Sequence, residues 1–125
     1  MIGVDTNVWI AYFAGDESDD IHLLSIALRF GQALMPPPVT AELLSQADFA
    51  LEDRGRILRA PKARLMPGFW ERAGETRAAL IRLGHRPRLA DTLIAQVCID
   101  HDIPLLTRDR GFTPFAKHSG LHLAK

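Results

Sequence analysis

The sequence predicts an α/β fold with a central, mostly parallel sheet of four to five short strands. Short apolar runs typical of buried strands alternate with longer segments of helical periodicity along the chain. Parallel strands that follow one another need crossover connections, and the helices in those connections cover both faces of the sheet. With 125 residues, we expect one domain over residues 1–125. The candidate strands are residues 1–4, 33–35, 63–66, 105–107 and 121–123.

The first strand and the first helix have a carboxylate between them. The apolar residues 1–4 end at Asp5, and the apolar density of residues 8–13 is typical of a buried helix. Thr6 or Asn7 is expected to cap this helix. Asp5 then lies at the C-terminal end of a strand, where ligands bind in open α/β sheets. A capping role alone is the alternative explanation of Asp5.

The next segments predict a loop, a helix and a brief strand. The acidic residues 15–20 lack the ligand spacing of a calcium-binding hand, so we expect a solvated loop that caps the following helix. That helix spans residues 21–30 and ends at Gly31. The prolines at 36–38 end the second strand, residues 33–35.

A second carboxylate follows this strand. We expect a helix over residues 39–44 with Thr40 as its N-cap, which places Glu42 in the first turn. A surface glutamate that favours the helix dipole is the alternative. The arginine-rich residues 53–64 are typical of a solvated face, with phosphate contacts as the alternative.

A basic loop and a third carboxylate open the last long helix. The loop, residues 85–88, follows a helix predicted over residues 68–83. The next helix begins at Leu89 and has Asp91 in its first turn, where a carboxylate is favoured by the helix dipole. It ends before Pro104, because the residue before a proline avoids the helical region.

A fourth carboxylate, Asp109, follows the next strand. Residues 105–107 form a short apolar run that fits a buried parallel strand, and Asp109 lies just past it. A short helix is expected over residues 112–117. Asp91 and Asp109 should therefore meet at the same rim of the sheet.

Composition excludes few functions. The formal net charge is zero, which argues neither for nor against nucleic-acid binding. Cys98 is the only cysteine, and its place on the apolar side of a helix predicts an inert core thiol. The five histidines lie at no recurring zinc spacing. No apolar run is long enough to span a membrane and no signal peptide is recognisable, so we expect a cytoplasmic protein without a membrane partner.

The four carboxylates Asp5, Glu42, Asp91 and Asp109 come from separate segments near strand ends or helix starts. Anionic groups within about 4–6 Å repel one another, and their pKa values rise unless a positive charge lies among them. Mg²⁺ or Mn²⁺ removes this repulsion, because such hard cations take oxygen ligands and Mg²⁺ usually keeps several waters. A bound metal of this kind activates water and stabilises charge on a phosphodiester. The pattern therefore predicts metal-assisted hydrolysis.

Four short motifs resemble those of the PIN-domain family in order and spacing. They are Val4-Asp5-Thr6-Asn7-Val8, Thr40-Ala41-Glu42-Leu43, Asp91-Thr92-Leu93-Ile94-Ala95 and Leu106-Thr107-Arg108-Asp109. With its single-domain length, the chain is most similar to the VapC-type toxins of prokaryotic toxin–antitoxin pairs. The resemblance implies a three-layer α/β/α sandwich and a Mg²⁺-dependent endoribonuclease acting on RNA. It also implies a homodimer that a cognate antitoxin inhibits by placing its tail in the active-site groove.

The resemblance also implies roles for individual residues. The acidic catalytic positions are Asp5, Glu42, Asp91 and Asp109, of which Asp5, Asp91 and Asp109 are the expected metal ligands. The polar positions that orient these carboxylates are Thr6, Asn7 and Thr107. The candidate phosphate contacts for RNA are Arg86, Arg88, Arg108 and Arg110. Some members carry a further acid where this chain has Gly111, so the number of metals stays open.

Two other classes of function stay open. In a catalytically silent binding module, the acids hold a structural metal and the protein acts by capturing a partner. In a phosphotransfer hydrolase of the haloacid dehalogenase kind, Asp5 is a covalent nucleophile, but such enzymes need a second aspartate where this chain has Asn7. Trp9 and Phe13 are expected in the core, and Tyr12 at a dimer or antitoxin contact.

Overall fold

The sheet is small and fully parallel. The computed structural model describes residues 1–124, and its strands run in the order β2-β1-β3. They are β1 (Ile2–Val4), β2 (Ala33–Leu34) and β3 (Leu105–Leu106). The predicted α/β fold is confirmed, whereas the prediction of four to five strands is wrong, because residues 1–124 form three.

Two further predicted strands pair with the sheet at one residue only. Near residues 63–66, Lys62 bridges to Met35, and at the other edge Leu123 bridges to Leu105. Neither pairing extends to a second residue pair, so no ladder forms. These segments cover the two edges of the sheet without widening it.

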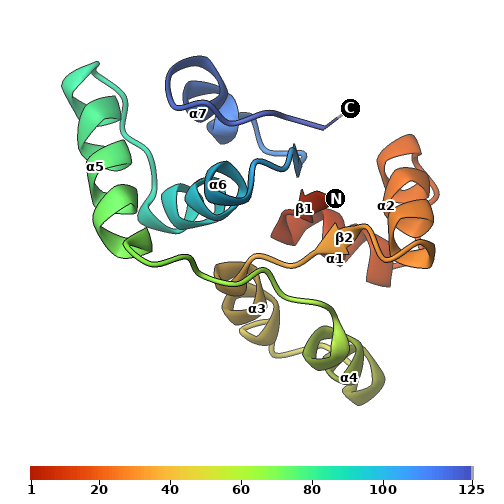
Figure 1. Cartoon of the computed structure of the whole chain (residues 1–125). Helices are drawn as coiled ribbons and strands as arrows, with labels where there is room; N and C mark the ends of the chain where they lie inside the picture. Colours follow the sequence, from red (N-terminus) through yellow and green to blue (C-terminus); the bar gives the residue numbers. More distant parts are fainter. Residues whose placement is uncertain (125) are drawn as a thin grey trace.

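Seven α-helices and one 3-10 helix connect and cover the strands within residues 1–124. They are α1 (Thr6–Phe13), α2 (Asp19–Arg29), α3 (Pro37–Leu44), α4 (Leu51–Arg59), α5 (Phe69–Arg82), α6 (Leu89–His101), η1 (Arg110–Phe112) and α7 (Thr113–His118). Figure 1 shows the strands at the centre, with α5 and α6 on one side and α2 on the other. None of these helices combines the length and the apolar character needed to cross a membrane.

The chain changes its winding direction at β1. From β1 it passes through α1 and α2 to β2 on one side, and the later helices lead to β3 on the other side. In such sheets the crevice outside the carboxyl ends of the two diverging strands is where ligands bind. The crevice at the ends of β1 and β3 is therefore the expected site.

The buried core joins the sheet to helices on both sides. Its fully buried members include Val4, Val8, Leu24, Leu80, Ile94, Leu105, Phe112 and Phe115. Each large side chain buried in this way contributes about 1.5–3 kcal/mol relative to exposure. Trp9 is 2% exposed and in the core, as predicted, whereas Phe13 only packs against the core.

Helix α6 approaches β1 most closely at Gly3. A Cβ atom on Gly3 would lie 2.5 Å from the Sγ atom of Cys98, so only glycine allows this packing. Cys98 is fully buried, and burial raises the pKa of its thiol to about 12. The predicted inert core thiol is confirmed.

The starts of two helices, α1 and α3, differ from the sequence prediction. The N-cap of α1 is Asp5, rather than Thr6 or Asn7. Helix α3 begins at Pro37, because proline is well suited to the first helical position, where no amide hydrogen bond is needed. Thr40 is therefore not an N-cap, and Glu42 lies in the second turn instead of the first.

Helix α4 was not predicted. Its sequence, LEDRGRILR, is strongly polar and contains the poor helix former Gly55. Only Ile57 is buried among its residues, so the apolar pattern that marks a helix is almost absent. The predicted solvated, arginine-rich face is nevertheless what most of this helix presents.

Candidate active site

The four predicted acids lie around the carboxyl-end rim of the sheet. Asp5 directly follows β1, and Asp109 follows β3 by three residues. Asp91 lies in the first turn of α6, and Glu42 in the second turn of α3. Segments separated by up to 104 positions in the chain thus meet at the crevice between β1 and β3.

Asp5 is buried and held at both of its carboxylate oxygens. Its side chain is 5% exposed. The Oδ1 atom accepts a hydrogen bond from the Thr6 backbone amide at 2.8 Å, and Oδ2 accepts one from the Thr107 hydroxyl at 2.7 Å. Burial raises the pKa of Asp5, and the charges of Glu42 and Asp109 add to this effect, whereas the two hydrogen bonds oppose it.

The hydroxyl of Thr6 fixes Glu42 beside Asp5. It donates to Oε1 of Glu42 at 2.5 Å, while the amide of the same residue donates to Asp5. One residue at the start of α1 thus connects two of the four acids. Thr6 lies where a polar supporting residue was expected.

Thr107 connects Asp5 to the loop that carries Asp109. Its hydroxyl donates to Asp5 and accepts a hydrogen bond from the Asp109 backbone amide at 3.0 Å. Asp109 caps the 3-10 helix η1 through a 2.8 Å bond from the Gly111 amide to its Oδ1 atom. Asn7 differs from the other two polar residues, because its side chain accepts from the Arg108 amide at 3.4 Å rather than touching a carboxylate.

Asp91 faces the same space from α6. A Cβ atom placed on Gly111 would lie 3.1 Å from Oδ1 of Asp109 and 3.5 Å from Oδ2 of Asp91, so both carboxylates border this glycine. Burial raises the pKa of Asp91 to about 6, with further contributions from the charges of Asp109, Asp5 and Glu42. The charge of Arg88 acts in the opposite direction.

The carboxylates are close enough to repel one another without forming a ready-made metal cage. Within residues 1–124, no three His, Cys, Asp or Glu side chains converge as a complete ligand set. Mg²⁺ does not require such a set, because it usually keeps several waters and binds proteins through one or two carboxylates. The donor chemistry of the cluster, oxygen atoms with excess negative charge, fits a hard divalent cation.

The four arginines expected to contact phosphates lie in different environments. Arg86, Arg88 and Arg110 form no ion pair with an acidic side chain among residues 1–124. Arg108 is bound to Asp16 at 2.7 Å and to Asp20 at 2.6 Å. The guanidinium of Arg108 is thus engaged by acidic side chains in the structure, and its role in RNA binding stays a prediction.

Sequence reasoning missed these two ion pairs, which connect the loop after β3 to Asp16 in the acidic loop and to Asp20 in the first turn of α2. The two partners are 88 and 92 positions apart, and no local pattern links them. The only available signal was the isolated acidic run itself, which a nearby cation would stabilise.

Comparison with known proteins agrees with this geometry. The model of the PIN-domain family matches residues 2–118. The chain belongs to the PIN-domain family. No curated protein sequence matches it significantly.

Solved structures of other PIN-like chains share the fold of this PIN domain. VapBC2 from Rickettsia felis, solved with a DNA fragment from its promoter, has a TM-score of 0.77 at 21% identity and covers 99% of this chain and 98% of its own. FitAcB from Neisseria gonorrhoeae has a TM-score of 0.72 at 18% identity, with coverages of 100% and 97%. VapBC-5 from Mycobacterium tuberculosis, a toxin–antitoxin family member, has a TM-score of 0.70 at 20% identity, with coverages of 98% and 96%. At these identities the similarity establishes the fold.

Proposed function

We propose that this PIN domain is a Mg²⁺- or Mn²⁺-dependent endoribonuclease and the toxin of a toxin–antitoxin pair. The observation that carries the proposal is the cluster of Asp5, Glu42, Asp91 and Asp109, in which burial and like charges raise the pKa of Asp5 and Asp91. A cluster that binds no cation would only lower stability. A divalent cation relieves the repulsion between these carboxylates, and this relief adds to the free energy of cation binding.

The proposed roles of the residues follow from their contacts. Asp5, Asp91 and Asp109 would hold the metal, which when bound supplies an activated water and charge stabilisation for phosphodiester hydrolysis. Thr6 and Thr107 hold the Asp5 carboxylate in one orientation through its two oxygens. Glu42 has one oxygen fixed by Thr6, which leaves the other able to orient a water or accept its proton.

The residue at position 7 argues against a covalent aspartyl intermediate. A phosphotransfer hydrolase of the haloacid dehalogenase kind needs a second aspartate where this chain has Asn7. The side chain of Asn7 accepts a hydrogen bond from the Arg108 amide and has no carboxylic acid to exchange a proton with a leaving group. The phosphotransfer hydrolase is therefore the weaker interpretation.

A protein partner is supported by an apolar groove beside the acids. The groove is about 430 Å³ and is lined by Pro37, Pro38, Ala41, Glu42, Leu65, Phe69, Trp70, Ala90 and Leu93. One similar structure, VapBC-5, is described as a member of the VapBC family of toxin–antitoxin systems, and another is described as VapBC2. We propose that a cognate antitoxin covers this groove, and that its removal exposes the acids to RNA.

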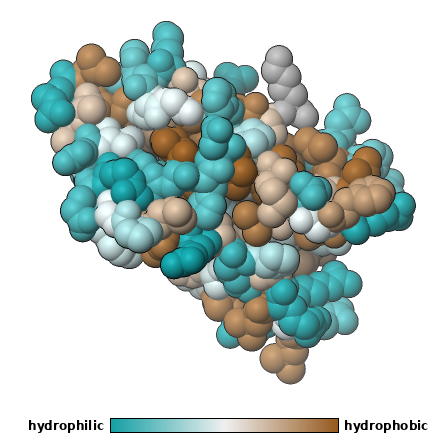
Figure 2. Space-filling view, viewed as in Figure 1, coloured by the Kyte–Doolittle hydropathy of each residue, from teal (hydrophilic) through white to brown (hydrophobic). Residues whose placement is uncertain are grey.

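The proposed homodimer has candidate surfaces on the outer helices. Apolar side chains are exposed at the C-terminal end of α2, where Phe30 is 68% exposed, and at the start of α4, where Leu51 is 86% exposed. Figure 2 shows apolar surface at the lower edge of the molecule, over α4, and on the right, over α2. Patches of this kind are common at protein interfaces.

The test is cleavage of total cellular RNA by antitoxin-free protein with Mg²⁺, with Mn²⁺ or with EDTA. We expect discrete fragments in both metals and none in EDTA. Asp91→Asn should lower the rate by at least about 1,000-fold, because it removes a metal ligand. Glu75→Gln, on the exposed surface of α5, is the matched control and should cleave like wild type.

Each contrary result has a definite meaning. Cleavage by Asp91→Asn at the wild-type rate would overturn the site assignment. Tight antitoxin binding without cleavage of a broad RNA panel would favour the catalytically silent binding module.

A further inference from the structure

We propose that a basic pocket at the corner between α5 and α6 binds a backbone phosphate of the RNA, using Arg77, His85 and Arg86. This inference rests on the proposed nuclease function and names a substrate subsite for it. The pocket shares no residue with the carboxylate cluster, and its lining residue Pro87 precedes Asp91 by four positions.

The pocket is a defined depression in the surface. It has a volume of about 440 Å³ and is lined by Arg77, Ile81, Gly84, His85, Arg86 and Pro87. No acidic side chain lines it, so its electrostatic character is set by two guanidinium groups and an imidazole. Guanidinium groups form charge-assisted hydrogen bonds with phosphates, which are the anionic groups of nucleic acids.

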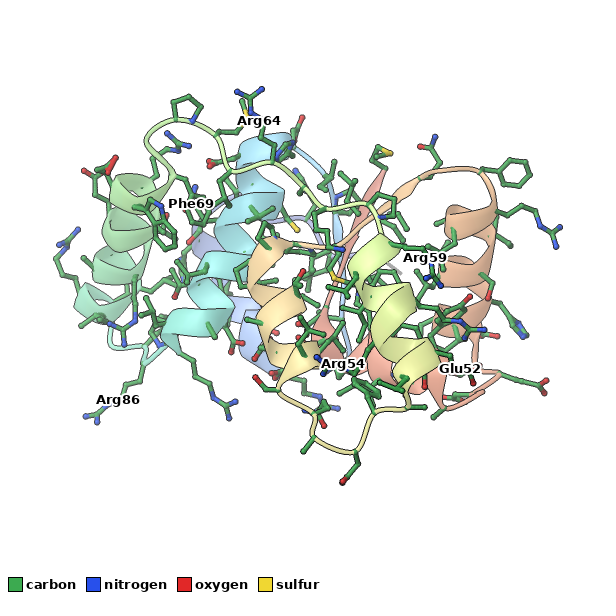
Figure 3. The ribbon with its side chains drawn as sticks, turned by 90° about the horizontal axis from the view of Figure 1, so that it is seen from below. Glu52, Arg54, Arg59, Arg64, Phe69 and Arg86 are labelled. Carbon is green, nitrogen blue, oxygen red and sulfur yellow. The ribbon has the colours of Figure 1, made fainter. Side chains whose placement is uncertain are left out.

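The guanidinium groups of this pocket are not occupied by acidic partners. Elsewhere in residues 1–124, Arg72 pairs with Asp100 and Arg108 with two aspartates. Arg77 uses only its Nε atom, which donates to the Pro87 carbonyl at 3.1 Å. Its terminal nitrogens and the whole Arg86 guanidinium have no hydrogen-bond partner among the described residues. Figure 3 shows the Arg86 side chain extending away from the ribbon.

The loop that carries His85 and Arg86 is rigidly held. Gly84 adopts a left-handed conformation with φ of 93° at the end of α5. The amide of Gly84 donates to Ile81 at 2.9 Å and that of His85 to Leu80 at 3.0 Å, which is the Schellman arrangement. Together with the bond from Arg77 to the carbonyl of Pro87, these contacts tie the loop to α5 at both of its ends.

The imidazole of His85, which forms part of the wall of the pocket, packs against a second imidazole. The imidazole of His85 lies against that of His118 in α7, with 5.4 Å between the ring centroids. The wall of the pocket is thus packed against a separate helix rather than formed by a free loop. A prearranged site loses less conformational entropy when it binds a phosphate.

The chain length between them limits how far the pocket can lie from the acids. Three residues separate Pro87 from Asp91, so their Cα atoms are at most about 14 Å apart. Arg88 lies between them as the N-cap of α6, and its charge acts on Asp91. A strand whose scissile phosphate lies at the carboxylates can place a neighbouring phosphate in the pocket. One RNA strand, with its regularly repeated phosphates, would therefore occupy both the carboxylate cluster and the basic pocket.

The experiment measures binding of a fluorescently labelled single-stranded RNA to full-length protein in EDTA, where no metal-dependent cleavage occurs. We expect Arg86→Gln to weaken binding roughly five- to tenfold and the double variant Arg77→Gln/Arg86→Gln to weaken it further. Each lost phosphate contact should lower the slope of log K against log salt by about 0.7. Arg29→Gln on α2 removes the same charge from an exposed position and is the matched control.

The outcomes separate this proposal from the proposed function. Arg86→Gln and Arg29→Gln with equal affinity and equal salt slope would overturn the pocket, even if the wild type cleaves RNA. A specific loss in Arg86→Gln would support the pocket, even if no cleavage is found. Because Arg86 is exposed and makes no internal hydrogen bond, its substitution should leave the melting temperature unchanged. Arg86→Lys, which keeps the charge, should restore most of the affinity.

Discussion

Two acidic clusters in this molecule are built in opposite ways. The first, which we call the Arg108 clamp, consists of Asp16, Asp20 and Arg108. The guanidinium of Arg108 donates to Asp16 at 2.7 Å and to Asp20 at 2.6 and 2.9 Å. These hydrogen bonds hold the pKa of both carboxyls below their usual range.

The second cluster, the carboxylate site of Asp5, Glu42, Asp91 and Asp109, has no such cation inside it. Burial and mutual repulsion raise the pKa of Asp5, and raise that of Asp91 to about 6. The same residue type therefore stabilises the protein in the clamp and destabilises it in the site. A group of carboxylates therefore indicates a cation-binding site when no basic side chain of the protein lies among them.

The largest expected difference between the clusters is their response to metal. At 100 times its dissociation constant, Mg²⁺ should raise the free energy of unfolding of the wild type by about 2.7 kcal/mol. Asp91→Asn should lose most of this gain, because it removes one proposed ligand and part of the repulsion that favours a cation. Thermal unfolding with and without Mg²⁺ measures the effect.

The clamp supplies the control for this experiment. Asp20→Asn removes a carboxylate that Arg108 already neutralises, so its Mg²⁺ response should equal that of the wild type. An equal Mg²⁺ response in Asp91→Asn and wild type would show that the metal, if it binds, does not use Asp91.

A smaller expected difference between the two clusters is the way in which pH changes the stability that each contributes. The folded-state pKa of Asp91, about 6, exceeds the unfolded value of about 4, so the metal-free native state binds more protons between these values. Its stability should therefore fall as pH rises from about 4 to about 6. Because Asp91 is only half-buried, solvent screening limits the loss to about 1 kcal/mol. The clamp has the opposite sign, because its stabilisation is complete above about pH 4 and is lost as pH falls further.

The variant Asp91→Asn separates the contribution of Asp91 to the pH dependence of stability from that of the clamp. In Asp91→Asn the metal-free protein should be more stable than wild type at pH 7, and its stability should change less between pH 4 and 6. Denaturant unfolding in EDTA across this range measures both effects. A wild-type pH dependence in the variant would mean that Asp91 is not the group that titrates.

The sequence predicted the helical and strand pattern well where apolar periodicity was strong. It failed at α4, where Ile57 is the only buried residue, and at the sheet edges, where pairing stops after one bridge. Strand length at an edge depends on partners that are distant in the sequence. Local patterns therefore overestimated the number of strands.

The candidate site was predicted in position but not in detail. The carboxyl-end rule for parallel strands predicted that Asp91 and Asp109 meet at one rim, and the structure brings Asp5 and Glu42 to the same rim. Which polar residue binds which acid was not predictable, because Thr6 and Thr107 act across 36 and 102 positions. The roles of these residues in catalysis await the cleavage assay.

The smallest expected effect comes from breaking the Arg108 clamp. Arg108→Gln removes two ion pairs between partly exposed side chains, so it should lower the melting temperature only slightly. The Mg²⁺ response should be retained, because none of the four site acids is a clamp partner. Arg29→Gln is again the matched charge change.

The same variant tests whether Arg108 also meets RNA. If the guanidinium serves only the clamp, Arg108→Gln should lower RNA affinity no more than Arg29→Gln, which removes the same charge from an exposed position. A much larger loss of affinity in Arg108→Gln would mean that RNA draws this side chain away from its aspartates. The clamp would then be a resting arrangement of a phosphate-binding arginine, and the contrast between the two clusters would hold only without substrate.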